Sequence, residues 1–545
     1  METKKILTRC ICGIATTFLY WFLFRPPLTF QSPAFWLMFI LGFGIPIIIF
    51  GFIGHLVDCE IGEETTLIGI IVAIVFVIFL FMHLVSINAF HTRALQTQLN
   101  VAESKEFTDI VDDFVIDSIP RIDESVAENL ANRKLGELED VVSQFEADDY
   151  STLINYNGKP FRVIPLKYSN GLKWLNNRKT GIPGYILIDL ISQEATYVKL
   201  KDGIKFSPSA CFGEDLNKHI KSVYPTAILG EYNFEIDDEG KPFWIVPQIT
   251  HNFCFSVKTV EHVIVIDAIN GKVTKHPISD VPEWIDRALD TSIVNNQINY
   301  WGKYKKGWWN SWTTQKGVKE ATDLYNFIIQ DNDVYLYTGI TSANGSDQSN
   351  IGFFLVNMRN GKATYTTCAS VNEKSAKKAA QAIYPEKKYK ATDPLLLNVE
   401  GKPTYCTSLK DSAGLVKMYA FVYATDYTIV GYATEQEGME KAIENYKLAL
   451  EGKSFTTNTD TQKEETTKLE DITFKVYALS QVVVNGTTSY YIAANDTVYI
   501  VPITANAKDY MSIKVGDEIV AKATLKGSYY LVSSFEIKQP ETTTE

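Results

Sequence analysis

The segment that decides the fold is residues 234–247, FEIDDEGKPFWIVP, together with residues 262–278, HVIVIDAINGKVTKHPI. Apolar and β-branched residues dominate both pieces, and each contains a short polar stretch with a glycine. Glycine adopts the backbone conformations that tight turns require, and proline is tolerated where the chain enters an edge strand. The segment therefore predicts antiparallel strands joined by turns at residues 240–242 and at Gly271.

The same phrases recur along the chain. The turn sequence Gly-Lys-Pro occurs at 158–160, 240–242 and 401–403. A strand, an Asp or Asn, a short turn and a second strand begin at 184, 262 and 352. Short amphipathic helices that end in Tyr-Pro are predicted at 216–225 and 376–385. Asp189, Asp267 and Asn357 share one place in the repeat, which fits turn residues that cap a strand rather than three active sites. The body is therefore predicted to be a set of repeated α+β units.

The order of helix, Tyr-Pro, strand, Gly-Lys-Pro turn and strand pair resembles PepSY domains. The resemblance is best over 214–278, weaker over 376–432 and partial over 151–200 and 325–366. It implies small units in which a helix packs on an antiparallel sheet. It also implies an extracytoplasmic, non-catalytic module that binds or inhibits peptidases or mediates interactions in the cell envelope.

A second resemblance covers residues 90–450, on phrases such as NYNGKPFRVIPL, YWGKYKKGWWNS, YTGITS and SNIGFFLVN. On these phrases the chain is similar to an uncharacterised family of multi-pass membrane proteins of Gram-positive bacteria, some of which carry a CvpA-family label. This resemblance is the more extensive of the two. It implies a membrane protein and brings no established mechanism.

The first 92 residues are predicted to be a transmembrane anchor with three helices. The firmest spans are 35–54 and 67–85, each about the 20 residues that a bilayer core requires. A third span, 6–24, is interrupted by Arg9, and its alternative is a secretory signal peptide. The basic residues before the first span favour a cytoplasmic N-terminus, so three crossings would leave the body extracytoplasmic. The two firm spans lack Asp, Glu and Lys, which argues against an ion-coupled transporter.

The net charge of −12 is concentrated between residues 101 and 150, which hold 15 acidic and 4 basic residues. This balance predicts an acidic helical stalk over 93–150, either a solvated spacer or a cation-binding segment. An acidic chain without a dense basic run is a poor candidate for duplex nucleic acid.

The remaining boundaries follow changes in composition. The first PepSY-like α+β region is expected over 151–300 and the second over 301–450, followed by a Thr/Lys/Glu-rich linker over 451–469. Short strands return over 470–545, which predicts a small β-barrel, OB-like or SH3-like, with a tail.

No catalytic or metal-binding motif is present in the sequence, so no catalytic residue, metal or cofactor is predicted. The seven cysteines form no pair of CxxC motifs, which argues against zinc. Cys211, Cys254, Cys368 and Cys406 remain either free thiols or disulfide partners. The acidic turn at 237–240 lacks EF-hand spacing and is expected to be a hairpin turn rather than a calcium site.

Two segments are candidates for binding a ligand or a partner. Residues 300–312, YWGKYKKGWWNSW, combine aromatic rings with lysines, which suits stacking on sugars, peptides or bases, or a lipid interface. Their alternative is a place in the core or at a domain joint. The second segment is a polar loop between two strands, whose alternative is a long hairpin connection. The candidate residues are Trp301, Tyr304, Trp308, Trp309, Asn310, Trp312, Thr338, Thr341, Asp347 and Asn350.

The sequence thus predicts a membrane-anchored, non-enzymatic envelope protein whose extracytoplasmic PepSY-like body binds a protein, peptide or wall-polymer partner. One rival is a membrane-anchored hydrolase with its site at the joint near residues 308–312. The other is a scaffold that faces the cytoplasm. A cleft with a perturbed carboxylate or histidine would favour the hydrolase.

Overall fold

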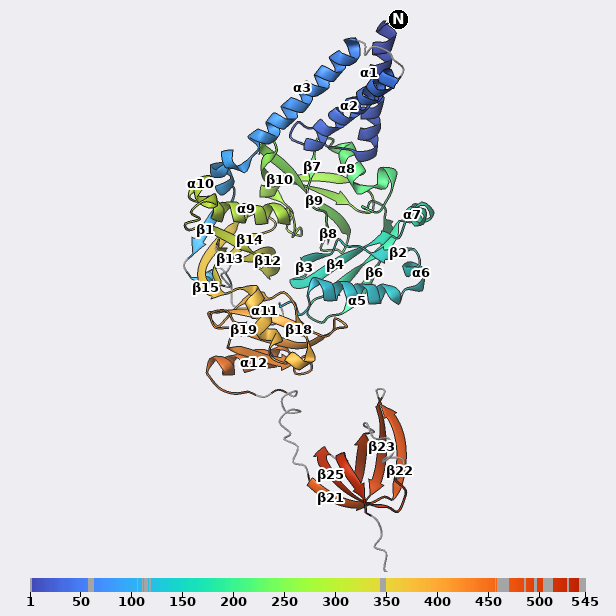
Figure 1. Cartoon of the computed structure of the whole chain (residues 1–545), viewed down its shortest axis with the longest axis vertical. Coiled ribbons are helices and arrows are strands. Elements are labelled where there is room, and N and C mark those ends of the chain that lie inside the picture. Colours follow the sequence, from blue (N-terminus) through green and yellow to red (C-terminus); the bar gives the residue numbers. More distant parts are fainter. Residues whose placement is uncertain are drawn as a thin grey trace, which may run out of the picture. The chain divides into compact units, whose positions relative to one another are not determined.

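The computed structural model describes residues 2–56, 63–104, 106–109, 111, 116, 119–343, 349–455, 457, 470–484, 487–494, 497–502, 513–526 and 529–538 of the chain. Its contacts divide into two units, Met1–Phe455 and Thr456–Glu545. Both are drawn in Figure 1. The fold is mixed α+β, with antiparallel pairing in each of its sheets.

The first unit begins with three apolar helices, α1 (Glu2–Phe24), α2 (Pro33–Leu56) and α3 (Glu63–Val85). Among the described residues, only Thr66–Val85 within α3 is long and apolar enough to cross a membrane. The apolar parts of α1 and α2, Cys10–Phe24 and Pro33–Pro46, are shorter than this. The short helix α4 (Thr92–Gln96) follows and leads into the body.

The first repeat (124–204) consists of a helix followed by a five-stranded sheet. Two short strands pair with opposite ends of the long strand β4, which then pairs with β5, and β5 pairs with β6. The bounds are α5 (Glu124–Gly136), α6 (Glu139–Val142), β2 (Phe145–Ala147), β3 (Thr152–Tyr156), β4 (Lys159–Tyr168), α7 (Gly171–Asn177), β5 (Ile182–Asp189) and β6 (Ala195–Ile204).

The second repeat (216–277) and the fourth repeat (373–434) have the same order and the same pairing. The second contains α8 (Leu216–Val223), β7 (Ile228–Leu229), β8 (Asn233–Ile236), β9 (Pro242–Phe253), β10 (Ser256–Asp267) and β11 (Val273–Pro277). The fourth contains α11 (Glu373–Gln381), β16 (Lys390–Ala391), β17 (Leu395–Val399), β18 (Lys402–Lys410), β19 (Val416–Tyr423) and β20 (Val430–Thr434), and α12 (Gly438–Leu450) packs on β20.

The third repeat (291–371) differs in one respect, because its outer strand is continuous. β12 pairs with β13 throughout, but its register shifts between Ala321 and Tyr325, where the other repeats break into two strands. The strand β1 (Val101–Ser104) joins this sheet beside β15. The bounds are α9 (Thr291–Lys303), α10 (Gly307–Trp312), β12 (Lys319–Gln330), β13 (Asp333–Ser342), β14 (Ser349–Asn357) and β15 (Ala363–Val371).

The turn chemistry expected from the repeated phrases is confirmed. Asp189 Oδ1 accepts from the backbone N–H groups two and three residues on, and Asp267 and Asn357 do the same in their repeats. Asn157 and Gly158 both have positive φ, 53° and 75°, as a two-residue hairpin turn requires. Asp331 and Asn332 take the corresponding conformation in the third repeat, φ 50° and 61°, without a Gly-Lys-Pro sequence.

The segment 93–150 differs from the acidic stalk that its composition predicts. The apolar face of α5, which includes Val126, Ala131 and Leu135, is buried in the main hydrophobic core. β1 joins the third repeat, and β2 joins the first. Of the acidic residues of this segment, α5 carries Glu124, which pairs with Arg162, and Glu128, which is half-buried. The density of acidic residues therefore does not indicate how this helix packs, whereas its apolar stripe does.

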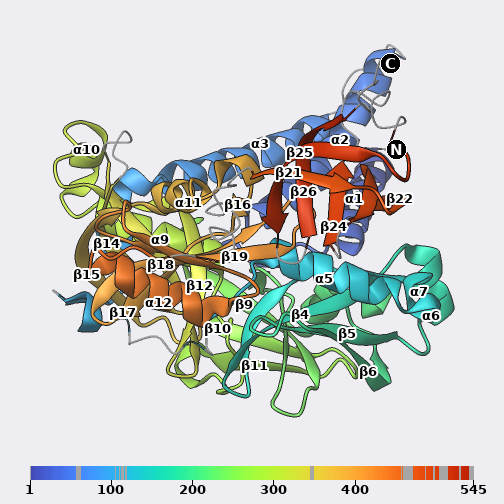
Figure 2. The ribbon, with the colours of Figure 1, turned by 90° about the horizontal axis from the view of Figure 1, so that it is seen from below.

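The main core runs through all four repeats rather than dividing at residue 300. Trp244 of the second repeat and Tyr405 of the fourth are both fully buried in this core, and Figure 2 shows the sheets of the four repeats within the first unit. Glycine is required at Gly431 of β20, because a Cβ there would lie 2.1 Å from the Cα of Tyr446 in α12.

The second unit is a six-stranded sheet in the order β21-β25-β26-β24-β23-β22. β24 and β26 are parallel, and the other pairs are antiparallel. The bounds are β21 (Glu470–Lys475), β22 (Ala478–Val484), β23 (Thr487–Ala494), β24 (Thr497–Pro502), β25 (Glu518–Lys526) and β26 (Tyr529–Ile537).

Candidate functional site

A cavity of about 870 Å³ lies where the four repeats of the first unit meet. Its wall includes the interruption of the outer strand in the first, second and fourth repeats, at 149–151, 230–232 and 392–393. In the third repeat it includes 325–327, directly after the register shift of β12. An interrupted strand leaves polar groups outside the hydrogen-bonded ladder. Corresponding positions of four repeats therefore supply polar groups to one cavity.

Arg287 forms one side of the cavity and is almost completely buried. Its Nη2 donates to Oγ1 of Thr291 at 2.7 Å and lies 3.5 Å from Oε1 of Glu231. Its guanidinium stacks over the ring of Phe327, 3.8 Å from the centroid. Its Nε has no hydrogen-bond partner among the described residues. Arg287 is thus held in place, and its Nε–H remains able to donate a hydrogen bond to a ligand.

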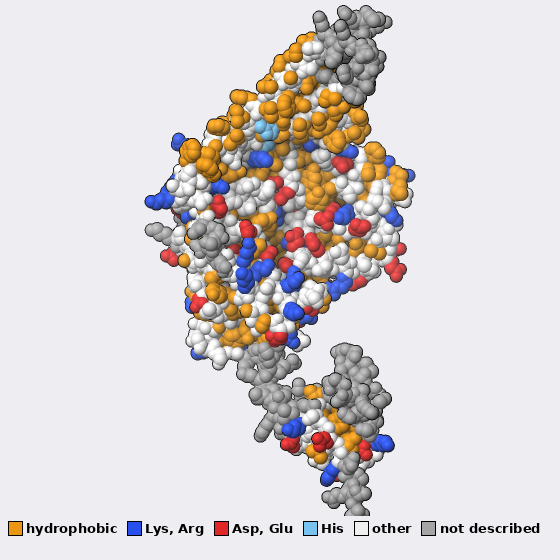
Figure 3. Space-filling model, viewed as in Figure 1, with side chains coloured by type: hydrophobic (Ala, Val, Ile, Leu, Met, Phe, Trp, Pro, Cys, Tyr) orange, Lys and Arg blue, Asp and Glu red, His pale blue; other side chains and the backbone are white. Residues whose placement is uncertain are grey.

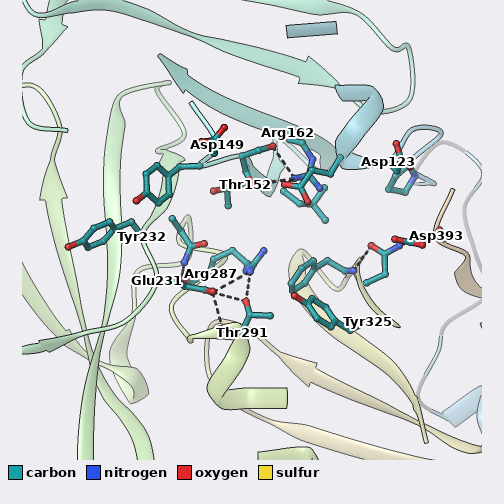
Figure 4. A pocket seen from close by; sticks show the side chains of 18 of the residues that line it. Asp123, Asp149, Thr152, Arg162, Glu231, Tyr232, Arg287, Thr291, Tyr325 and Asp393 are labelled. Atoms are coloured by element: carbon teal, nitrogen blue, oxygen red, sulfur yellow. Dashed lines mark hydrogen bonds and ion pairs between the residues drawn. The ribbon is translucent and has the colours of Figure 1, made fainter. Parts of the chain in front are cut away.

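Arg162 of β4 forms the opposite side of the cavity, as Figure 4 shows. Its Nη1 donates to Oε1 of Glu124 at 2.9 Å and to Oγ of Ser151 at 3.0 Å. Burial is the main cause that lowers its pKa, and the Nε is again without a partner among the described residues. Guanidinium remains charged in proteins, so the cavity contains two fixed positive charges.

Acidic and aromatic side chains complete the lining. Figure 4 shows Asp149 and Tyr232 near one end and Tyr325 and Asp393 near the other. Asp393 pairs with Lys377 at 2.7 Å. The cavity therefore offers charges of both signs and aromatic rings, which suits a polar ligand with groups of both charges.

The cavity also adjoins the loop between α1 and α2. Pro27 lines it, and Leu28 N–H donates to the carbonyl of Pro225 at 2.8 Å. Nζ of Lys221 donates to the carbonyl of Arg25 at 2.7 Å, and burial lowers the pKa of this lysine to about 8. The helical end of the first unit and the cavity are thus directly connected.

Two buried carboxyl groups support Arg287 from behind. Glu235 accepts from the backbone N–H groups of Asp286 and Arg287, at 2.8 and 2.9 Å. Asp286 accepts from the N–H of Asn155 at 2.6 Å, which connects the first repeat with the segment between the second and third repeats. Burial raises the pKa of Glu235 to about 7 and that of Asp286 well above its usual value, with the Glu235 charge as a further cause. These acids position the segment that carries the arginine.

The described lining of the cavity offers carboxylates, such as Asp149 and Glu231, as its candidate acid–base groups. No histidine belongs to this described lining, and its thiol, Cys406, has a pKa that burial raises to about 12, so the reactive thiolate is disfavoured. No cluster of three or more His, Cys, Asp or Glu residues that could hold a metal is found in the described part of the chain. Cys211, Cys254, Cys368 and Cys406 are all free thiols.

The aromatic candidates of 300–312 separate into inner and outer residues. Trp301 is buried against Phe354, and Tyr304 is buried in a small cluster with Leu95. Trp308 is half-buried, whereas Trp309 and Trp312 are exposed. Oδ1 of Asn310 accepts from the N–H of Lys316 and from Oγ1 of Thr314, which closes the loop after α10.

The polar-loop candidates connect strands. Oγ1 of Thr338, fully buried, donates to the carbonyl of Leu324, and Oγ1 of Thr341 donates to that of Ser349. Nδ2 of Asn350 donates to the hydroxyl of Tyr405 at 3.2 Å, across two repeats. Asp347 lies outside the described residues. None of the described candidates from either segment lines the central cavity.

A smaller hollow of about 350 Å³ lies beside the residues that follow α10. Among its described lining residues, Lys319 is the only one with a titratable side chain, and its Nζ donates to the hydroxyl of Tyr365 at 2.9 Å. Nothing in this hollow resembles the carboxylate or histidine that a hydrolase at this joint would require.

Sequence reasoning missed the residues that line the central cavity. They come from four separate repeats and carry no local motif. One signal was present, because a polar or acidic residue follows the first short strand of each broken repeat, at Asp149, Glu231 and Asp393. Alignment of the repeats on their Gly-Lys-Pro turns would have brought Asp149 and Glu231 to the same position and Asp393 to the next one.

Comparisons with known proteins identify no family. No protein-family model matches the chain, and no curated protein matches it. The solved structure of the tetrameric p202 HIN2 is similar at 12% identity over 28% of this chain and 90% of that chain, with a TM-score of 0.11. A Synechocystis apocarotenoid oxygenase mutant is similar at 10% identity over 52% and 60%, with a TM-score of 0.17. Scores this low carry no argument about fold or function. The fold and the cavity themselves define an α+β repeat protein with a central polar cavity.

Proposed function

We propose that the chain is a membrane-anchored, non-enzymatic protein of the cell envelope whose repeats bind a partner in the central cavity. The observation that carries this proposal is the convergence of three strand interruptions and the register shift of β12 on one polar cavity. A peptide segment fits best, because guanidinium groups pair with carboxylates while Tyr232 and Tyr325 offer faces for side chains. A protein terminus or a wall polymer with charged side groups is the alternative occupant.

The proposed anchor comprises α1, α2 and α3, with the N-terminus in the cytoplasm and the repeats outside. The α3 segment Thr66–Val85 supports the proposal, as does the close approach of α1 and α2. A Cβ on Gly42 would lie 2.1 Å from Oγ1 of Thr17, and Oγ1 of Thr16 donates to the carbonyl of Gly42. Small residues and hydroxyl groups at a helix contact are typical of transmembrane pairs.

The repeats are proposed to be PepSY-like, and the second unit to be an OB-like barrel. A helix before each sheet and the shared strand order support the first proposal. For the second, β21 and β22 form opposite edges of the six-stranded sheet, yet only residues 476 and 477 separate them. A single bent strand at both edges closes a sheet into a barrel.

The side of the membrane is testable with an impermeant protease. We expect protease added to intact cells to digest the repeats, since three spans and a cytoplasmic N-terminus place them outside. A cytoplasmic marker protein must remain intact. Repeats that stay protected until the cells are lysed would contradict the extracytoplasmic orientation and favour the cytoplasmic scaffold.

Binding in the cavity is testable with the full chain in lipid nanodiscs. The probes are synthetic peptides of mixed charge and purified peptidoglycan fragments. Tyr325, which is 43% exposed, lines the cavity, and Tyr427, 51% exposed, does not. We expect Tyr325→Ala to weaken binding about tenfold, the effect of losing about 1.4 kcal/mol.

Tyr427→Ala is the matched control and should leave the affinity unchanged. Asp149→Asn, a change at a mostly exposed carboxylate of the same cavity, should alter the preference for cationic peptides. Equal binding by both tyrosine variants, or no binding to any probe, would overturn the assignment of the cavity. Binding to the wall fragments alone would identify a polymer as the occupant.

A further inference from the structure

A group of exposed aromatic side chains lies close to the end of α3. Phe90, Trp309 and Trp312 are 67%, 69% and 70% exposed. Tryptophan is highly buried on average, so two exposed rings on one short helix require a reason. We propose that these residues, with Lys305 and Lys306, form an aromatic foot that lies in the headgroup region of the lipid bilayer. The proposal rests on the membrane anchoring proposed above.

The foot is firmly attached to the body. The inner tryptophan, Trp308, packs on the small cluster that contains Leu95 of α4 and Tyr304. Its ring stacks on that of Trp312, with centroids 6.0 Å apart and an angle of 16°. α10 also contacts α9. Because the inner ring is held, the outer rings present a fixed apolar surface.

This surface continues the apolar surface of α3. Phe81, Leu84, Ile87 and Phe90 are exposed at every third residue through the end of the helix and beyond it. Figures 1 and 2 both place α10 beside this end of α3. Figure 3 shows apolar side chains in this region with basic side chains next to them. A bilayer that surrounds α3 therefore reaches the foot.

The chemistry of the foot matches a lipid interface. Tryptophan concentrates at the membrane–water boundary, where its ring is apolar and its N–H meets water. Lysine places its stem along apolar surface and its ammonium group in the headgroup layer. Lys305 and Lys306 are both exposed. A second copy of the chain would bring the same lysines together, which disfavours self-association through this surface.

The test uses the full chain in nanodiscs whose lipids carry bromine near the headgroup end of the acyl chains, with unbrominated lipids as the reference. Bromine quenches tryptophan fluorescence at short range. Trp21 and Trp36, in α1 and α2, report anchoring. In the Trp21→Phe/Trp36→Phe variant, we expect the brominated lipids to quench the fluorescence of the tryptophans of the foot clearly. Adding Trp309→Phe and Trp312→Phe should remove most of it.

Tyr427→Trp, added to the variant that lacks all four of these tryptophans, is the matched control, since this exposed position lies in the fourth repeat. It should not be quenched. Quenching of Trp21 and Trp36 without quenching of the foot would contradict the lipid contact of the foot and would still support membrane anchoring. No quenching at any of these positions would overturn both. If the quenching disappears when the protein is diluted, and position 312 forms cross-links between copies, the foot contacts a second copy of the chain rather than lipid.

Discussion

Trp244→Ala is expected to lower the free energy of unfolding of the first unit by about 3–5 kcal/mol, the usual cost of removing a buried tryptophan. The side chain is fully buried. Its Nε1–H donates to the carbonyl of Phe206 at 2.9 Å, and its ring meets Tyr150 and Phe234 edge to face. Because Tyr150 belongs to a strand interruption of the first repeat, the substitution removes a contact between two repeats as well as volume.

The measurement is chemical denaturation of the full chain in detergent, followed by near-ultraviolet circular dichroism. Trp309→Ala is the matched control, because it deletes the same ring from an exposed site. Its effect should stay within about 0.5 kcal/mol, as for surface substitutions in general. Equal losses in the two variants would show that the first and second repeats do not share a continuous core.

The repeated units were predictable because the conformation of each turn depends on residues that are close together in the sequence. Asp189 and Asp267 cap their own strands through bonds to the next few backbone groups, so the sequence alone indicates the conformation. The third repeat was matched only in part, since Asp331 and Asn332 replace the Gly-Lys-Pro phrase while keeping the same backbone turn. Residue identity changed there, and the required conformation did not.

The cavity and the role of 93–150 were not predictable in the same way. Arg162 and Arg287 are 125 positions apart in the sequence and meet one cavity only because the repeats pack together. For residues 93–150, the prediction gave more weight to the density of acidic residues than to the apolar stripe that buries α5. The Trp-rich segment was conspicuous by composition, but whether each ring is exposed depends on the packing of α4 and α9 around α10.

The second large effect concerns pH. Asp286→Asn is expected to reduce the loss of stability of the first unit that accompanies a rise in pH above the ordinary pKa of an aspartic acid. In the wild type, burial raises the pKa of Asp286 well above its usual value and that of Glu235 to about 7. A carboxyl group with a raised pKa in the folded state contributes stability below its unfolded pKa. That contribution is lost as the pH rises through the folded value.

For Glu235 the rise from 4.5 to about 7 corresponds to about 3 kcal/mol, at about 1.4 kcal/mol for each pKa unit. Asparagine keeps the acceptor for the N–H of Asn155 and carries no charge, so it resembles the protonated aspartic acid. Glu235 keeps its own raised pKa in the variant, because burial is the main cause of that rise. Relative to wild type, the variant should therefore gain stability as the pH rises above the ordinary pKa of an aspartic acid.

Denaturation midpoints at a series of pH values test this expectation, with Asp280→Asn at an exposed position as the control. The control profile should parallel that of the wild type. A profile for Asp286→Asn that also parallels the wild type would contradict the raised pKa of Asp286.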